Sequence, residues 1–502
     1  MKKIITIVLA LAAMTAVHSA SITVKVDSVR YQTITGFGAA ACDGAMCPFA
    51  GDTEPVKLLY GPDSPIGLNI MRMEISPNHK GNITAADVGW DTPYDWYGSV
   101  PSAREAKKRG AIVFGTPWSP PGDYKTNGTA QGGNSADQGN QRGELRADCY
   151  EKFFPWLNNF LIYMNNCGVL VDAVSIQNEP DWWVNYSGCL YTPQQQLTLV
   201  KNYAYMLNRE RFGVRLISAE PLGFDPAYSD LLLNDTAARK HIDIVAGHIY
   251  GHPPLGNMKK AAVLAAKYGK EVWMTEHSVD NANDHNGLPT WHENLIFAEE
   301  LNECMLAGCT GYIYWYMRAH WAFVGTGEAK HNPGNAKNTL LPRAYLMSHF
   351  AKHVTGSTRL GSSPSPVSNN PAFETSAYIK GDSLIVMAID TTKNAMDLKL
   401  QLPVSVKSGV HLLSTQEALC QELPITIDEP AKELIVNMPA RSLNTYIFQI
   451  DKGSAAIRDL WVGDDGSKKT YYDLQGRRLP EPKGLCIEKS SNGSSRKLFF
   501  DD

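Results

Sequence analysis

The sequence has no long run of basic residues, and its 502 residues carry a formal net charge of −4 at pH 7. A protein that binds nucleic acid through the phosphates needs concentrated positive charge. The sequence also lacks a phosphate-binding loop and a glycine-rich dinucleotide turn after the first predicted strand. These absences argue against nucleic-acid-binding proteins and nucleotide-dependent enzymes.

The nine cysteines are an odd number, and they form neither a CxxC pair nor a cluster with histidine. We therefore expect no zinc site, no other metal site and no cofactor. Cys42 with Cys47 and Cys304 with Cys309 lie close enough in the sequence for disulfides. Sequence spacing leaves disulfides and buried free thiols open for both pairs.

Beyond the N-terminus, no apolar segment is long enough to span a membrane. At the N-terminus two lysines precede an apolar run over residues 4–17, and small residues follow at Ser19 and Ala20. This order is typical of a secretory signal peptide, with a membrane anchor as the alternative. We expect residues 1–20 to be a signal peptide and the protein to be secreted (periplasmic, cell-surface or extracellular).

Short apolar runs alternate with helical segments through most of the chain. The runs include "GLNIMRMEIS", "GAIVFGTP", "VDAVSIQ" and "KEVWMTE", and helices are predicted over Tyr150–Asn166, Thr192–Arg211, Met258–Tyr268 and Glu293–Ala307. Alternation of strand and helix is typical of a parallel sheet. The number of units predicts the α/β fold class, with a (β/α)8 TIM barrel over residues 36–350. A doubly wound sheet is the alternative.

After the barrel region the pattern of polar and apolar residues changes. Residues 351–450 form short runs of alternating polarity separated by turn residues, which predicts an appended β-sandwich domain. Residues 21–35 also resemble a strand, and we expect them to join this sandwich. Residues 451–502, rich in lysine, glycine and serine, predict a C-terminal tail or sorting module. The oligomeric state stays open, and a monomer is the simplest expectation.

Nearly every predicted barrel strand ends in polar or aromatic residues. They are Arg72, Trp118, Asn178 with Glu179, Glu220, His248 with Tyr250, Glu276 with His277, and Trp315 with Arg318. Active sites of TIM barrels lie at the C-terminal ends of the strands, so these residues should converge.

Two acids stand out, because Glu179 follows the fourth predicted strand and Glu276 the seventh. A single glutamate at a strand end is more often a salt-bridge or capping partner. Cleavage of a glycosidic bond, however, needs two carboxyl groups. One protonates the leaving oxygen, and the other attacks or stabilises the anomeric carbon.

The motifs "SIQNEP", "TPWSPP", "AGHIYG", "MTEHS" and "GFGAAACDG" together resemble glycoside hydrolase family 30 over about residues 21–450. "YSGCLYTP" and "TPWSPPGDYKTNGT" bring the sequence nearest to the bacterial endo-xylanase, glucuronoxylanase-like branch. The resemblance implies a barrel fused to a β-sandwich and a retaining glycosidase. It also implies Glu179 as general acid/base and Glu276 as nucleophile.

Other site residues follow from the same resemblance. Asn178 should hydrogen-bond the 2-hydroxyl of the sugar, and Tyr250 or His248 should position the nucleophile. Trp118 and Trp315 should form the floor of the sugar-binding cleft, although a place in the barrel core remains an alternative for each aromatic.

Arg318 concerns specificity. Glucuronoxylan-specific members use an arginine after the eighth strand to bind the carboxylate of a glucuronic acid branch, and "YWYMR" matches the start of that pattern. Ala319, His320 and Trp321 depart from it, as does Ser278, where a tyrosine is usual. Branch reading and a salt bridge at the barrel rim both stay open for Arg318.

The expected function is therefore a secreted, retaining endo-1,4-β-xylanase that acts on xylan. One alternative is another family 30 glycosidase, such as a β-glucosidase or glucosylceramidase-like enzyme, a β-1,6-glucanase or a xylobiohydrolase. A second alternative is a carbohydrate-binding protein without catalysis, which would not need both acids.

Overall fold

The structure is a computed structural model. It describes residues 21–41, 51–77, 96–250, 254–280, 282–283, 287–318, 322–327, 336–365 and 373–452, together with four strands between residues 469 and 500. The chain divides into two units, Met1–Asp451 and Lys452–Asp502. The predicted signal peptide and the pair Cys42 and Cys47 lie outside the described residues.

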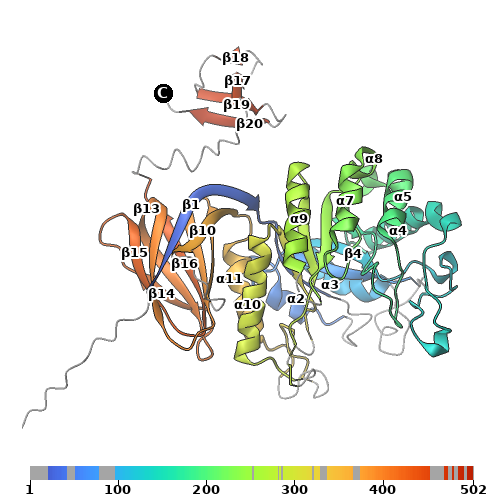
Figure 1. Ribbon diagram of the computed structural model, residues 1–502, viewed down its shortest axis with the longest axis horizontal. Coiled ribbons are helices and arrows are strands. Elements are labelled where there is room, and N and C mark those ends of the chain that lie inside the picture. Colours follow the sequence, from blue (N-terminus) through green and yellow to red (C-terminus); the bar gives the residue numbers. More distant parts are fainter. Residues whose placement is uncertain are drawn as a thin grey trace, which may run out of the picture. The chain divides into compact units, whose positions relative to one another are not determined.

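Eight parallel strands of the first unit close into a barrel (Figure 1). The strands are β2 (Gly36–Ala40), β3 (Ile70–Ile75), β4 (Ile112–Pro117), β5 (Ala173–Ser175), β6 (Arg215–Ile217), β7 (Ile244–His248), β8 (Glu271–Glu276) and β9 (Gly311–Tyr314). Pairing of Gly36 with Gly311 joins the first barrel strand to the last. Glu179 thus follows the fourth barrel strand, and Glu276 ends the seventh.

Helices cover the outside of the barrel. They are α2 (Glu54–Leu59), α3 (Val100–Lys108), α4 (Tyr150–Asn166), α5 (Pro193–Tyr203), α6 (Arg209–Phe212), α7 (Pro226–Asn234), α8 (Thr236–Arg239), α9 (Pro254–Lys267), α10 (Trp291–Leu306) and α11 (Pro342–His353). Capping boxes start two of them, because Thr192 exchanges hydrogen bonds with Gln195 and Thr290 does so with Glu293.

The predicted helix over Thr192–Arg211 is wrong in one respect, because it breaks after Tyr203 and resumes at Arg209. The side chain of Asn158 lies at the break. Its amide donates to the carbonyl of Met206 (2.8 Å) and accepts from the backbone N–H of Asn208 (2.9 Å). This contact from a neighbouring helix satisfies backbone groups that a continuous helix would have paired internally.

The barrel interior changes from apolar to polar along the strands. The lower layer consists of Ile70, Phe114, Ala173, Ile217, Ile244, Ala246, Trp273 and Ile313, all buried. Side chains two residues apart on a strand share a face. Arg72 therefore stands above Ile70, Thr116 above Phe114 and His248 above Ala246, which places polar groups at the mouth. The apolar layer is a packed base for these groups.

Cys304 and Cys309 are buried free thiols, so no disulfide joins them. The thiol of Cys309 lies 2.8 Å from the carbonyl oxygen of Gly311.

A second β-structure packs beside the barrel in the same unit. Its strands are β1 (Ser21–Thr33), β10 (Thr358–Ser365), β11 (Phe373–Lys380), β12 (Ser383–Asp390), β13 (Met396–Ser414), β14 (Gln421–Ile425), β15 (Ala431–Met438) and β16 (Ser442–Ile450). They form one eight-stranded sheet in the order β1-β10-β11-β12-β16-β13-β14, in which β15 pairs with β13 and β1 also pairs with β13. The predicted fold class, a TIM barrel with an appended β-domain, is confirmed.

Strand β13 belongs to both halves of this sheet. Its first part, from Met396 to Gln401, pairs with β15 and with β1, and its last part, from Val406 to Ser414, pairs with β16. A register shift separates the two parts. The sheet therefore folds over along β13.

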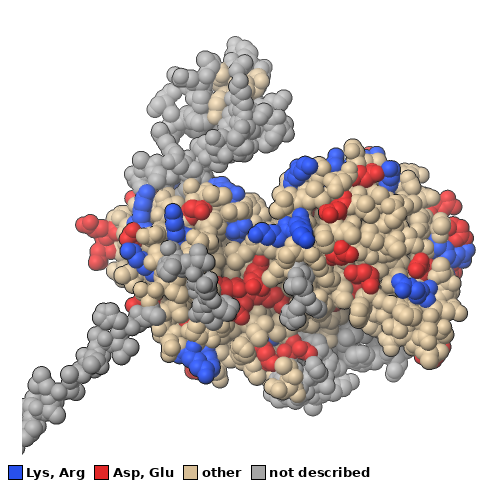
Figure 2. All heavy atoms as spheres, viewed as in Figure 1, with Lys and Arg blue, Asp and Glu red and all other residues tan. Residues whose placement is uncertain are grey.

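Side chains of α10 and α11 tie this sheet to the barrel. The indole N–H of Trp291 donates to the carbonyl of Arg441 (2.8 Å), and the amide of Asn302 donates to Glu374 (2.9 Å). The two ring nitrogens of His349 each lie 2.8 Å from a hydroxyl of the sheet. Figure 2 shows acidic side chains gathered over the region of α10, whose sequence contains four glutamates.

The second unit contains a four-stranded antiparallel sheet in the order β18-β17-β19-β20. Its strands are β17 (Lys469–Tyr472), β18 (Arg478–Leu479), β19 (Gly484–Ser490) and β20 (Ser495–Phe500). Across the described part of the chain, no helix is long and apolar enough to cross a membrane.

Candidate active site

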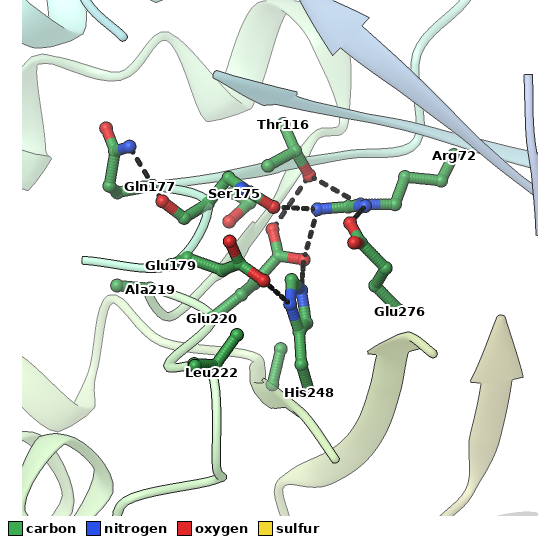
Figure 3. A network of polar contacts seen from close by, with 12 residues as sticks. Arg72, Thr116, Ser175, Gln177, Glu179, Ala219, Glu220, Leu222, His248 and Glu276 are labelled. Atoms are coloured by element: carbon green, nitrogen blue, oxygen red, sulfur yellow. Dashed lines mark hydrogen bonds and ion pairs between the residues drawn. The ribbon is translucent and has the colours of Figure 1, made fainter. Parts of the chain in front are cut away.

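Arg72, from β3, is the centre of a polar network at the barrel mouth (Figure 3). Its guanidinium donates to the carboxylate of Glu276 and to the amide oxygen of Asn178 (2.7 Å), and it lies 3.0 Å from Glu220. Its Nε donates weakly to the hydroxyl of Thr116 (3.4 Å). One cation from the second barrel strand thus positions side chains from the third, fourth, fifth and seventh strands.

Glu276 is the last residue of β8, and donors hold both of its oxygens. Oε2 accepts from Arg72, and Oε1 accepts from the hydroxyl of Tyr250 (3.1 Å). Burial raises the pKa of Tyr250 well above its usual value, so the phenol keeps its proton and remains a donor. A carboxylate fixed in this way points in a single direction. The Ser278 side chain, at the position of a sequence departure, also hydrogen-bonds with Tyr250.

Glu179 follows β5 in an uncommon backbone conformation, with φ of +44°. A non-glycine residue in this region carries strain of about 1–3 kcal/mol, which the surrounding structure must offset. Here the backbone N–H of Glu179 donates to the carbonyl of Glu220 (2.9 Å), and that of Asn178 donates to Pro117 (2.9 Å). These bonds to the neighbouring strand ends turn the acid toward the barrel axis.

The two predicted catalytic acids lie together. A carboxylate oxygen of Glu179, a carboxylate oxygen of Glu276 and a ring nitrogen of His248 all lie within 4.8 Å of one another. Both acids are buried, Glu179 at 7% exposed and Glu276 at 6%. Burial, together with the negative charge of Glu276, raises the pKa of Glu179.

His248, the last residue of β7, bridges two acids. Its Nδ1 lies 3.1 Å from Glu179, and its Nε2 lies 3.4 Å from Glu220. Burial alone would lower the pKa of His248, but Glu276, Glu179 and Glu220 together raise it to about 9. His248 thus contacts the acid Glu179, whereas Tyr250 is the residue that contacts the nucleophile candidate.

Trp118 and Trp315 lie side by side next to Arg72. Their ring centroids are 5.7 Å apart, with 38° between the ring planes, and the guanidinium of Arg72 lies 4.6 Å from the Trp118 ring. Trp118 is 9% exposed and Trp315 is half-buried. Their role as the floor of a sugar-binding cleft stays a prediction.

Arg318, after β9, makes different contacts. Its guanidinium lies 3.7 Å from the carboxylate of Asp52 and donates to the Asp52 carbonyl (3.4 Å), while Lys337 lies 2.9 Å from the same carboxylate. The side chain of Arg318 is 3% exposed. The neighbouring residues that depart from the family pattern, 319–321, lie outside the described part of the chain.

The loop that follows Glu179 is fastened to the loop that follows β4. Lys125 is 2% exposed, and its ammonium donates to the carbonyls of Ala130 (3.1 Å), Gln131 (2.8 Å) and Gly188 (2.6 Å). Burial lowers the pKa of Lys125 to about 8. The backbone N–H of Gly132 also donates to the carbonyl of Tyr186 (2.7 Å).

Two aromatic side chains on this fastened loop face solvent. Trp182 is 51% exposed and Tyr186 is 49% exposed. Partial burial and the charges of Glu179 and Glu276 raise the pKa of Tyr186. The loop that follows Glu179 therefore exposes two aromatic rings to solvent.

Glu179, His248 and Glu276 would be spaced suitably for a metal ion. However, the guanidinium of Arg72 already forms an ion pair with the carboxylate of Glu276, and both ring nitrogens of His248 face carboxylates. A positive neighbour and an imidazole with a raised pKa both oppose binding of a cation. These residues suit an uncharged ligand better than a metal.

Arg72 and Glu220 were expected as polar residues at strand ends, but neither was predicted as a residue of the site. Their shared face with the apolar layer, two residues along each strand, is a signal that could have identified Arg72. Glu74 lies two residues beyond Arg72 on the same strand, and burial raises its pKa to about 7. Tyr186 begins the motif "YSGCLYTP", but it was not expected as a residue of the site.

A TIM barrel with two buried carboxylates at its mouth, one held by an arginine and a tyrosine and the other by a histidine, defines a glycoside hydrolase. The family model described as "Glycosyl hydrolase catalytic core" matches residues 164–305, which include both acids. Over most of its length the chain is similar to xylanases of glycoside hydrolase family 30.

The relatives cover most of the molecule. A glucuronoxylanase of Bacillus subtilis (strain 168) is 28% identical over 447 residues, which is 86% of this chain and 92% of the relative. A family 30 subfamily 8 xylanase from Clostridium acetobutylicum is 28% identical, with a TM-score of 0.68, over 85% of this chain and 99% of that chain. A family 30 endoxylanase from Clostridium papyrosolvens C71 gives 27% identity and a TM-score of 0.67, over 85% of this chain and 100% of that chain.

Proposed function

We propose that the protein is a retaining endo-β-1,4-xylanase in which Glu276 is the nucleophile and Glu179 the general acid/base. The observation that carries the proposal is the closeness of the two carboxylates, because an oxygen of one lies within 4.8 Å of an oxygen of the other. Retaining glycosidases hold the two carboxyl groups about 5–5.5 Å apart, whereas inverting enzymes need about 6.5–9.5 Å to accommodate a water molecule. Xylan as the substrate rests on the relatives of 27–28% identity described above, which are xylanases.

In the first step an oxygen of Glu276 attacks the anomeric carbon while Glu179 gives its proton to the departing oxygen. A glycosyl-enzyme ester forms at Glu276, and the glycosidic C–O bond breaks. In the second step Glu179 takes a proton from water, the oxygen of that water attacks the anomeric carbon, and the ester bond breaks. Glu179 regains its proton, and the product keeps the original anomeric configuration.

The contacts of each acid suit its role. Glu276 has two donors that orient it for attack, Arg72 and Tyr250. Glu179 has a raised pKa, so it retains a proton to give to a poor leaving group. The oxygen of Asn178 accepts from Arg72, which leaves its amide nitrogen to donate to the 2-hydroxyl of the sugar.

The exposed rings of Trp182 and Tyr186 support binding of a polymer. They lie on the loop that follows the acid, and the acid protonates the leaving part of the substrate. We therefore place the leaving xylose units against these rings, since aromatic faces stack well on the apolar faces of sugars. Such a platform suits cleavage inside a chain, where sugars extend on both sides of the scissile bond.

A substrate comparison tests the proposal. Purified protein is incubated with glucuronoxylan, linear xylooligosaccharides, linear β-1,4-glucan, β-1,6-glucan and an aryl β-glucoside, and the first-formed anomer is followed by NMR. We expect xylan fragments of several lengths with β-configuration at the new reducing end. Preferential cleavage of a glucan or glucoside would favour another family 30 glycosidase, and α-configured products would overturn the roles of both acids.

Guidance by a glucuronic acid branch is a finer part of the proposal and rests on Arg318. A guanidinium offers a carboxylate two parallel hydrogen bonds, and this arginine follows the last barrel strand. Asp52 already lies against it, so a branch carboxylate would have to share or replace this contact. A comparison of variants on decorated and plain chains decides between these two roles.

We also propose that the enzyme is exported, because its first residues have the order of a secretory signal peptide. Mass analysis of the mature protein recovered outside the cytoplasm tests this, with removal of about residues 1–20 expected. Retention of these residues in the mature protein would count against it.

A further inference from the structure

We propose that Glu220 is a positioning residue which fixes the orientation of the proton on His248, so that His248 and Glu179 hold one proton between them for each turnover. The inference rests on the proposed role of Glu179 as general acid/base. Neither Glu220 nor His248 would touch the reacting atoms; both would act through Glu179.

Glu220 is an anion in the folded protein. Its side chain is fully buried, and several donors converge on it (Figure 3). They include the hydroxyl of Thr116 (2.8 Å), the guanidinium of Arg72 (3.0 Å) and Nε2 of His248 (3.4 Å). Burial by itself would raise the pKa of Glu220, but Arg72 and His248 outweigh it and lower the pKa to about 2.

The imidazole of His248 lies between Glu220 and Glu179. A carboxylate anion only accepts hydrogen bonds, so the nitrogen that faces Glu220 must carry a hydrogen. That nitrogen is Nε2, which leaves Nδ1 as the atom whose proton count changes. Nδ1 lies 3.1 Å from Oε1 of Glu179. The proton can therefore sit on Nδ1, as an imidazolium beside an anionic Glu179, or on Glu179, where it is ready for the leaving group.

The charge around His248 is mostly negative. The charged groups that face or influence it are Glu179, Glu220, Glu276, Arg72 and Asp181. The ring of Tyr250 also lies edge-on to the imidazole, with centroids 6.0 Å apart. Carboxylates outnumber the single cation, and the pKa of His248 is raised to about 9. The shared proton therefore stays in the pair well above neutral pH.

The proton balance of the reaction follows from this arrangement. Glu179 gives the shared proton to the leaving oxygen as Glu276 bonds to the anomeric carbon, and the pair is then empty. Glu179 next takes a proton from the attacking water as the ester at Glu276 breaks. The pair is full again, and no outside acid or base is needed.

The test is the pH dependence of kcat/KM for Glu220→Gln, measured on xylooligosaccharides. Loss of the anion at residue 220 lowers the pKa of the proton that His248 and Glu179 share. The alkaline limb of the pH profile of kcat/KM should therefore move to lower pH by about one unit or more. KM should change little, since Glu220 does not touch substrate. On an aryl xylobioside with a good leaving group, which needs little protonation, the first step should show almost no shift.

Two further variants separate charge from structure. Glu220→Asp keeps the anion, and its alkaline limb should stay near the native position even if kcat falls. Thr116→Val removes the 2.8 Å hydrogen bond to Glu220 without a change of charge, and it too should leave the limb in place. A native limb in Glu220→Gln, or an equal shift in Thr116→Val, would overturn the proposal.

A measurement on the native protein covers the case in which Glu220→Gln does not fold. In protein labelled with 15N-histidine, with the signal of His248 assigned by its absence from a His248→Gln variant, Nε2 should carry hydrogen throughout and Nδ1 should titrate. The opposite tautomer would exclude the proposed orientation. Failure of the proposed function is distinguishable, because it would appear in the native enzyme as absence of xylan cleavage or as inverted products.

Discussion

Arg72 and Glu220 form an ion pair of 3.0 Å in which neither side chain is exposed to solvent. Arg72 is also the partner of Glu276. One buried cation therefore offsets two buried anions at the barrel mouth. Removal of one member of a buried pair leaves a charge without compensation, which typically costs about 3–5 kcal/mol.

Replacement of this cation should accordingly affect stability as well as activity. Arg72→Met leaves Glu220 and Glu276 facing each other, so the free energy of unfolding should fall by about 3–5 kcal/mol, and turnover should collapse. Urea unfolding measures the first effect. The exposed pair of Glu54 and Lys57 is the control, since Lys57→Met should leave unfolding unchanged. An Arg72→Met protein of native stability would contradict this reading of the network.

Glu276→Ala should abolish hydrolysis, because the attacking carboxylate is gone. Azide should restore turnover of an activated aryl xyloside, since a small anion fits the space of the missing carboxylate. The product should be the glycosyl azide of inverted configuration, identified by NMR. A retained azide, or rescue of Glu179→Ala with the same product, would mean that the two roles are exchanged.

Glu179→Gln should depend strongly on the leaving group. General acid assistance is worth roughly 10²- to 10⁴-fold, so activity on xylan should fall by about that factor. Formation of the glycosyl-enzyme from a dinitrophenyl glycoside should change little, because this leaving group departs without a proton. Rates of the pre-steady-state burst measure that step. Equal losses on both substrates would indicate a structural role for Glu179.

Arg318→Ala distinguishes branch reading from support of the rim. If Arg318 binds a glucuronate, kcat/KM on glucuronoxylan should fall. The corresponding loss of transition-state stabilisation should be about 1.5–3 kcal/mol, the typical contribution of a hydrogen bond to a charged group. Undecorated xylooligosaccharides should be unaffected. Asp52→Asn is the matched control, because it alters the same rim contact without removal of the guanidinium. Parallel losses on both substrates in both variants would assign Arg318 to the rim.

Folding stability should decrease toward alkaline pH at the contact between α10 and the β-domain. Burial raises the pKa of Glu374 to about 8 and that of Glu299 to about 7. In the unfolded chain these groups titrate near about 4.3. The folded state therefore holds protons that the unfolded state releases, and the stability they contribute is complete below about pH 4.3 and is lost as pH rises through about 8.

Glu374→Gln keeps a neutral side chain at every pH, so its unfolding free energy should vary less between pH 5 and pH 9 than that of the native protein. Chemical unfolding at several pH values measures this slope. Glu417→Gln, on an exposed turn, should follow the native profile. A native slope in Glu374→Gln would place the pH dependence elsewhere.

The sequence was sufficient for the barrel because its pattern is local. Apolar runs, capping residues and the polar ends of strands are each readable within a few residues, and the helix at Tyr150–Asn166 has the predicted bounds. The two acids could be chosen because a known motif surrounds each. Contacts between residues that lie far apart in the sequence could not be predicted. The break before Arg209 depends on Asn158 of another helix, and the roles of Arg72 and Glu220 depend on distances between strands.

Arg318 illustrates the same limit. Its place after the last barrel strand follows from the sequence, but its pairing with Asp52 does not, because Asp52 comes from the opposite end of the barrel sequence. The sequence also could not predict that Lys125 joins the two loops. Its partners are backbone carbonyls, which every residue has.

The pairing of β1 has a consequence for biosynthesis. This strand leaves the ribosome before any part of the barrel, yet its partners in β10 and β13 begin only at Thr358 and Met396. Until those residues emerge, β1 is an unpaired edge with free backbone groups, the kind of segment that invites association with other chains. A ribosome that stalls while it translates the barrel region would thus expose β1 as an unpaired, aggregation-prone strand. Holdase chaperones should crosslink to residues 21–33 in such nascent chains.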